Sequence, residues 1–98
     1  MDKKYTWHEV KRQCNLEKHG LDFKDADYVI ESPYRLDIET IRNGENRQQS
    51  FAYVFEMLTV LTVVHIPNAN PHIISFRPAK YSEREVYYEW LENDYNDN

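Results

Sequence analysis

The sequence predicts an α+β fold: an antiparallel sheet of about four strands with two helices before it and one after it. Apolar residues recur every three to four positions up to about position 32 and again after position 82, but they alternate in between. Short connections and the Asn43-Gly44 hairpin signal favour an antiparallel meander. Because such a sheet must bury at least one face, helices are expected to cover it.

The two N-terminal helices follow from capping and periodicity. Thr6 to Glu9 has the pattern of a capping box, and it opens a helix with Trp7, Val10 and Cys14 on one face. Gly20 suits the left-handed position that ends this helix. A second short helix is predicted from Asp22 to about Ser32, before Pro33, and its shared face comprises Phe23, Ala26, Val29 and Ile30.

The strands follow from alternation and the last helix from a second cap. We expect strands starting at Tyr34, over Gln48–Phe55, over the apolar run Leu58–Ile66, which is buried on both faces, and over His72–Arg77. Ser82 to Glu85 has the pattern of another capping box. The helix that it opens has the apolar face Val86, Tyr87, Trp90 and Leu91.

Length and composition indicate one small domain. The chain has 98 residues, and we expect residues 1–92 to form the domain and the acidic residues 93–98 to fray. Cys14 is the single cysteine, which excludes an internal disulfide framework and a multi-cysteine zinc site and fits a reducing compartment. With no membrane-length apolar run and no secretory signal pattern, we expect a cytoplasmic location.

The net charge of −5 argues against a simple nucleic-acid coat protein. The acidity is concentrated near the end of the chain: four acidic residues and no Lys or Arg lie within residues 89–98. Without those four, 17 − 4 = 13 acidic residues face 12 basic ones, for a net charge of −1. Local basic clusters are therefore compatible with the remaining body.

Two long motifs resemble those of the BrnT family of type II toxins. The first comprises Trp7, Lys11 and the run from Asn15 to Ala26, and the second comprises Ile73–Ala79, Glu83, Arg84 and Tyr87. Looser matches lie at Glu45-Asn46-Arg47 and Val63-Val64-His65, so that the resemblance covers about residues 5–90.

The resemblance implies a RelE-like ribonuclease fold, cleavage of cellular RNA, growth inhibition and neutralisation by a BrnA-type antitoxin. It also implies contact with DNA only through the antitoxin, and a homodimer is compatible with such a complex. The chain departs from the family pattern at His72, where Arg is usual, and in the acidic residues of the last helix. Both departures weaken the surface that would attract RNA.

Metal-independent RNA cleavage needs a group that titrates near neutrality and cations around one phosphate. We expect His19 to be the acid or base and Lys18 a phosphate ligand, although both also suit a helix C-terminus. Arg77 either grips a phosphate or forms an ion pair with a helix. Arg47 either joins that phosphate or is a solvated hairpin residue. His65 either takes part in catalysis or is a satisfied core residue.

The RNA-binding residues that we expect are Trp7, Lys11 and Tyr87. Both aromatic rings can stack an unpaired base, but both also lie on apolar helix faces, where a core position is the alternative. No cofactor is expected. The spacing of the four histidines gives no metal-ligand pattern, and the two glycines exclude a glycine-rich phosphate loop.

Three functions follow from these observations. The first is a toxin that cleaves RNA. The second, motivated by the acidic last helix, is a toxin-fold binding module with weak catalysis that acts through a protein partner. The third is a domain that self-associates through a strand at the sheet edge.

Overall fold

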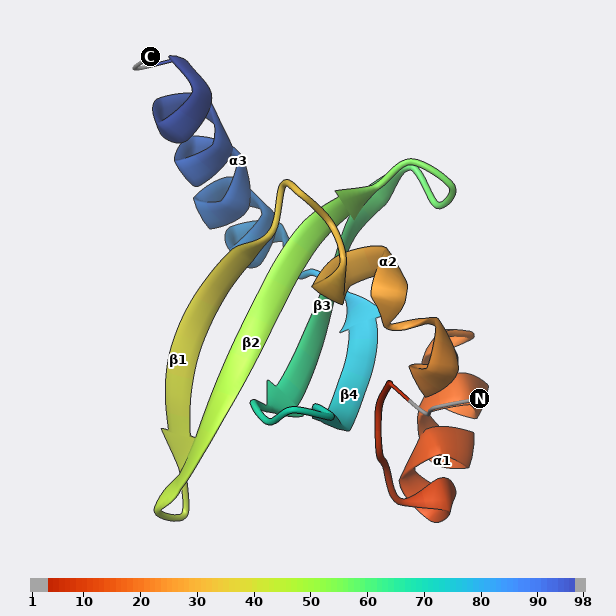
Figure 1. Ribbon diagram of the computed structural model, residues 1–98. Helices are drawn as coiled ribbons and strands as arrows, with labels where there is room; N and C mark the ends of the chain where they lie inside the picture. Colours follow the sequence, from red (N-terminus) through yellow and green to blue (C-terminus); the bar gives the residue numbers. More distant parts are fainter. Residues whose placement is uncertain (1–3, 97–98) are drawn as a thin grey trace.

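The computed structural model describes residues 4–96, and Figure 1 shows their arrangement. Three helices and one short 3-10 turn flank a four-stranded sheet within this part of the chain. In chain order the elements are α1 (Glu9–His19), η1 (Phe23–Asp25), α2 (Asp27–Ile30), β1 (Leu36–Arg42), β2 (Glu45–Val54), β3 (Thr59–Ile66), β4 (His72–Pro78) and α3 (Tyr81–Asn96).

The sheet confirms the predicted antiparallel meander, with strand order β1-β2-β3-β4. Asn43 and Gly44 both have positive φ, 52° and 76°, as the tight turn between β1 and β2 requires. The strand bounds differ from the prediction. Phe55 and Leu58, both expected within strands, lie instead in the turn between β2 and β3 and are exposed.

Each face of the sheet is packed by different helices. Residues of η1 and α2, the segments that directly follow α1, bury one face, which we call the α1 face. Their core partners on the strands are Ala52, Val54, Leu61, Val63, Ile73 and Phe76. The opposite face, the α3 face, has a smaller core of Phe51, Val60, Ala79 and Tyr87. Beyond this core α3 projects away from the sheet (Figure 1). The expectation that β3 is buried on both faces is therefore confirmed.

The predicted apolar face of α1 is wrong. Val10 is 76% exposed and Cys14 is exposed as well, whereas Asn15 is the buried residue of the helix. The predicted capping box is also absent, because the helix begins after His8 and no side chain caps it. The Thr6 side chain instead lies 2.8 Å from Nδ1 of His72, and its backbone pairs with β4.

Asn15 is buried because its amide covers the outer edge of β4. Its Nδ2 donates to the carbonyls of Phe76 and Leu21 at 2.7 and 3.0 Å. Its Oδ1 accepts the backbone N–H of Phe76 at 3.2 Å. Both backbone groups of Phe76 that point away from β3 are therefore satisfied by a side chain, which protects an edge that would otherwise pair with another chain.

The second predicted helix is split in two. Asp22 accepts the backbone N–H of Lys24 and begins η1, and it also accepts two hydrogen bonds from Arg12 at 2.7 and 2.8 Å. The helical path then resumes as α2, and its apolar face packs on the sheet as predicted.

The last helix starts one residue before the predicted cap. Glu83 reaches back and accepts the backbone N–H of Lys80 at 2.7 Å, which is the reciprocal half of a capping box two residues earlier than Ser82 to Glu85 would place it. Tyr87, Trp90 and Leu91 face the sheet as expected, but Val86 is exposed. Helix α3 continues to Asn96, beyond the predicted start of the tail, and residues 97 and 98 lie outside the described part.

A buried polar network lies on the α1 face. Ser50 donates to Asp37 at 2.6 Å, so Nε2 of His65, 3.0 Å from the same hydroxyl, carries a hydrogen and donates to it. Nδ1 of His65 is buried without a hydrogen-bond partner among the described residues. Burial lowers the pKa of His65, so its ring is neutral at pH 7.

We expect Asn15→Ala to lower the free energy of unfolding by about 2–4 kcal/mol, because it leaves both backbone groups of Phe76 without a partner. Urea unfolding of Asn15→Ala and of Glu17→Ala, an exposed position on the same helix, tests this. Equal stability of the two variants would show that the edge needs no side-chain partner.

We expect His65 to make the protein less stable in acid. Its pKa is lower in the folded chain, so the unfolded chain binds more protons below pH 6.5 and the free energy of unfolding falls as the pH drops. His65→Gln should reduce this slope between pH 7 and 5. Both proteins should carry His19→Gln, because the pKa of His19 is lowered as well. Parallel slopes would contradict the buried neutral state of His65.

Candidate active site

The residues predicted for catalysis come from α1, β2, β3 and β4. One group of them lies where α1 ends. Helix α1 runs beside β4, because Asn15 pairs with Phe76. His19 follows Asn15 by one helical turn, and Arg77 follows Phe76. The register that Asn15 sets therefore brings His19 to the end of β4.

The charges around His19 show the same proximity. Burial lowers the pKa of His19, and the positive charges of Lys18 and Arg77 lower it further. The imidazole is therefore neutral at pH 7 and can accept a proton. We call Lys18, His19 and Arg77 the cation cluster. It combines one titrating group with two positive charges, which is the combination that phosphate chemistry requires.

Arg77 forms the ion pair that was one of its two predicted roles. Its Nη1 and Nη2 donate to the two carboxylate oxygens of Glu83 at 2.9 and 3.0 Å. Gln49 donates to the same carboxylate at 3.3 Å. Hydrogen bonds from Arg77 lower the pKa of Glu83 to about 2, and the same hydrogen bonds raise the pKa of Arg77. The guanidinium is thus held in a fixed orientation by a permanent negative charge.

Arg47 lies on the same α3 face but away from the cluster. It lies four residues before Phe51 on β2, and Phe51 is the residue that the β-ladder places in line with Arg77. Strand geometry puts the Cα atoms of the two arginines roughly 16 Å apart. Nε of Arg47 donates to Glu45 at 2.9 Å.

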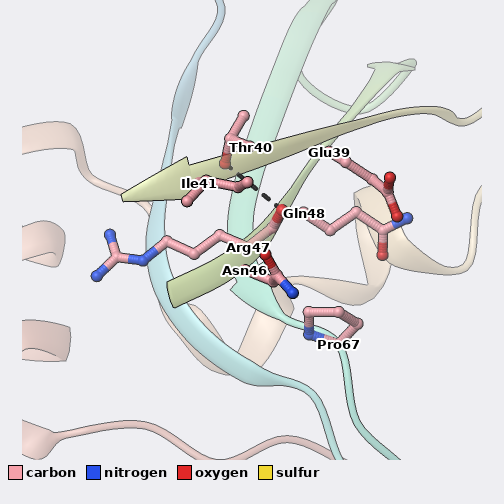
Figure 2. Close-up of a pocket in the computed structure, with 7 residues that line it drawn as sticks. All are labelled: Glu39, Thr40, Ile41, Asn46, Arg47, Gln48 and Pro67. Atoms are coloured by element: carbon pink, nitrogen blue, oxygen red, sulfur yellow. Dashed lines mark hydrogen bonds between the residues drawn. The ribbon is translucent and has the colours of Figure 1, made fainter. Parts of the chain in front are cut away.

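A polar hollow of about 530 Å³ adjoins Arg47, and Figure 2 shows the residues that line it. Glu39, Gln48 and Pro67 lie together on one side of the hairpin, and the guanidinium of Arg47 extends in the other direction. The hollow and the guanidinium therefore do not form one site.

Two other predicted residues are buried. His65 belongs to the network with Ser50 and Asp37 on the α1 face. Tyr87 is fully buried; its hydroxyl donates to the carbonyl of Tyr34 at 2.7 Å and accepts the N–H of Tyr53 at 3.1 Å. Neither ring has a surface open to RNA in this arrangement.

The remaining predicted residues lie on or just before α1. Trp7 is half-buried against the core, and its indole N–H donates to Glu9 at 3.1 Å. Lys11 is exposed. Both are therefore at the opposite end of α1 from Lys18 and His19.

Residue-by-residue inspection of the sequence missed Asn15 and Gln49. Asn15 falls within the first family motif, but helical periodicity assigned burial to its apolar neighbour Cys14. Gln49 lies on an alternating strand beside bulky residues, and nothing in its pattern signals a contact with α3. Glu83, however, lies six residues after Arg77. An acidic residue so close in sequence to an Arg at the end of a strand indicates an ion pair.

Among the described residues, no group of three or more His, Cys, Asp and Glu side chains is arranged to hold a metal ion. Within the same part of the chain, no helix combines the length and the apolar character needed to cross a membrane.

The chain resembles a known protein family over most of its length. No curated protein matches the chain. A family model, described as the ribonuclease toxin BrnT of type II toxin–antitoxin systems, matches residues 7–83. This match includes α1, the whole sheet and the start of α3 with Glu83, and so contains the entire cation cluster. The chain therefore belongs to the BrnT family of ribonuclease toxins.

Proposed function

We propose that this chain is a cytoplasmic, metal-independent endoribonuclease toxin that inhibits growth by cleaving RNA and is neutralised by a BrnA-type antitoxin. The observation that carries the proposal is the cation cluster, in which a neutral His19 is flanked by Lys18 and Arg77. The family match supports it, because the matched region contains all three residues. The RelE-like fold that the resemblance implies stays a prediction.

In the proposed reaction the 2′-hydroxyl of RNA attacks the adjacent phosphorus. His19 takes the proton of the 2′-hydroxyl as the new O–P bond forms. Lys18 and Arg77 stabilise the charge on the phosphorane oxygens. The bond from phosphorus to the 5′-oxygen then breaks, and the leaving oxygen takes a proton from water. The products are a 2′,3′-cyclic phosphate and a 5′-hydroxyl end.

Arg47, Trp7 and Lys11 bind the RNA away from the scissile bond in this proposal. Arg47 shares the α3 face with Arg77, at a distance that spans two to three nucleotides of extended backbone, so it contacts a neighbouring phosphate. Trp7 and Lys11 bind the strand near the start of α1. The buried His65 and Tyr87 support the sheet and α3 and take no proton.

One observation favours the alternative, a toxin-fold binding module with weak catalysis. Glu83 accepts from Nη1 and Nη2 of Arg77, the end-on pair of donors that a phosphate could also use. RNA must therefore displace Glu83 or share the guanidinium with it. The two functions differ in whether removing this carboxylate charge exposes a productive phosphate site.

We expect His19→Gln and Arg77→Lys each to lower the rate of RNA cleavage by about 10²-fold or more, because the first removes the base and the second removes the planar fork. The rate of the unsubstituted protein should rise with pH and be half-maximal below pH 6.5, since the pKa of His19 is lowered. The assay uses purified protein, a labelled oligoribonucleotide and EDTA.

Lys4→Gln is the matched control, because it removes one exposed positive charge beside α2, where Lys4 pairs with Asp27 and Glu31. Cleavage that persists in both cluster variants, or that needs an added divalent metal, would overturn the proposed mechanism.

We expect Glu83→Gln to bind RNA at least about threefold more tightly than Glu85→Gln, measured by fluorescence anisotropy with a 2′-O-methyl oligonucleotide. Gln keeps an acceptor for the N–H of Lys80 but removes the charge that holds Arg77. Glu85→Gln removes the same charge from an exposed position of α3. Equal affinities would mean that Arg77 does not contact the phosphate.

A further inference from the structure

An apolar groove lies on the part of α3 that carries no cation. Two hollows of about 360 and 300 Å³ share Tyr34, Tyr53 and Phe55 in their linings. Tyr88 and Leu91 of α3 form one of its walls. We call this surface the tyrosine groove.

The rim of the tyrosine groove exposes large apolar side chains. Phe55 is 71% exposed, and Leu58 in the same turn is 77% exposed. Tyr34 and Tyr88 are exposed as well. A group of this size on a small chain marks a surface that another molecule covers, because burying it removes apolar area from water.

The charges around the groove are acidic. Asp27, Glu31 and Glu56 line it, and its lining includes no Lys or Arg among residues 4–96. Along α3, Glu85 and Glu92 lie three residues before and four after Tyr88, on the same side of the helix.

One neighbouring cation, Lys4, offsets part of this charge. Lys4 approaches Asp27 and Glu31 only at 3.8 and 3.7 Å, from an exposed position. Arg84 turns back toward the Ala79 carbonyl and the Tyr81 ring.

We propose that the tyrosine groove binds a helical segment of a partner protein whose apolar ridge is flanked by Lys and Arg. The apolar floor fits such a ridge, and the carboxylates of the rim fit the flanking cations. RNA is disfavoured, because its phosphates would face these carboxylates. In so far as the inference rests on the proposed function, this partner is the antitoxin.

The groove and the cation cluster contact different parts of α3. The groove residues Tyr87, Tyr88 and Leu91 follow Glu83, which holds Arg77, by four to eight residues, or roughly 6–12 Å along the helix axis. A segment docked in the groove therefore does not need to cover Arg77, and partner binding and RNA cleavage can be measured separately.

The test uses two fluorescein-labelled amphipathic peptides of about 18 residues with the same Leu and Phe ridge. One carries Lys on its flanks and the other carries Glu. Binding to the full chain is measured by anisotropy, and RNA cleavage is measured on the same proteins. The groove variant is Phe55→Ser with Tyr88→Ser. Ile41→Ser, on β1, is the matched control, because Ile41 is 74% exposed and lies outside the groove.

We expect the Lys peptide to bind the unsubstituted chain at least tenfold more tightly than the Glu peptide, and more weakly as salt is raised. The groove variant should lose at least tenfold in affinity, while Ile41→Ser binds normally. Equal binding of both peptides, or an equal loss in Ile41→Ser, would overturn the proposal. So would an oligouridylate that competes for the groove, or self-association of the chain that the groove variant abolishes.

RNA cleavage distinguishes this proposal from the proposed function. The groove variant should cleave RNA normally, and Arg77→Lys should lose cleavage but still bind the Lys peptide. If the unsubstituted chain cleaves RNA but does not bind the Lys peptide, only the groove proposal fails. If it binds the Lys peptide but does not cleave RNA, only the ribonuclease proposal fails.

Discussion

The position of α1 depends on the buried amide of Asn15. Its two hydrogen bonds to the backbone of Phe76 connect a helix to the open edge of a sheet, a place where apolar packing alone would not set a register. Thr6 adds a backbone bridge at the other end of β4. Because these contacts fix both ends of the segment, His19 is held near Arg77 although 58 positions separate them in the chain.

The chemistry of the cluster follows from that register. A histidine at a helix C-terminus is ordinarily stabilised in its charged form by the helix dipole. Here burial and the positive charges of Lys18 and Arg77 act in the opposite direction and lower its pKa. The same Arg77 lowers the pKa of Glu83, so that the cluster contains one neutral base, two cations and one carboxylate that stays ionised. This balance leaves a local group of cations on an acidic chain.

Most of the fold could be predicted from the sequence because its signals are local. Alternation gave the strands, Asn43-Gly44 marked the hairpin, and Gly20 ends α1 with φ of 70° as expected. The failures occur where tertiary contacts overrule local rules. Thr6 and Ser82 have capping patterns, but the Thr6 side chain bonds to His72 of β4, and the carboxylate of Glu83 caps α3 two residues early. Cys14 fits the apolar period of α1, but the edge of β4 requires a polar partner there, and Asn15 is buried instead.

The candidate site was only partly visible for the same reason. The family motifs place Lys18, His19 and Arg77 in the right part of the chain, but a motif does not reveal which side chains meet. Arg47 and His65 lie in matched segments as well, yet the strand register places Arg47 far along the sheet and turns His65 into the opposite face. Gln49 and Glu83 show the converse, since their contacts appear only once α3 is placed against β2.

The most direct measurement of the central claim is a crystal structure of the chain with an oligonucleotide that carries 2′-deoxyribose at the cleavage position. The account predicts one phosphate in contact with both Lys18 and Arg77, with C2′ of the preceding sugar beside the imidazole of His19. A phosphate bound only at Arg47, or an oligonucleotide lying along the tyrosine groove, would contradict it.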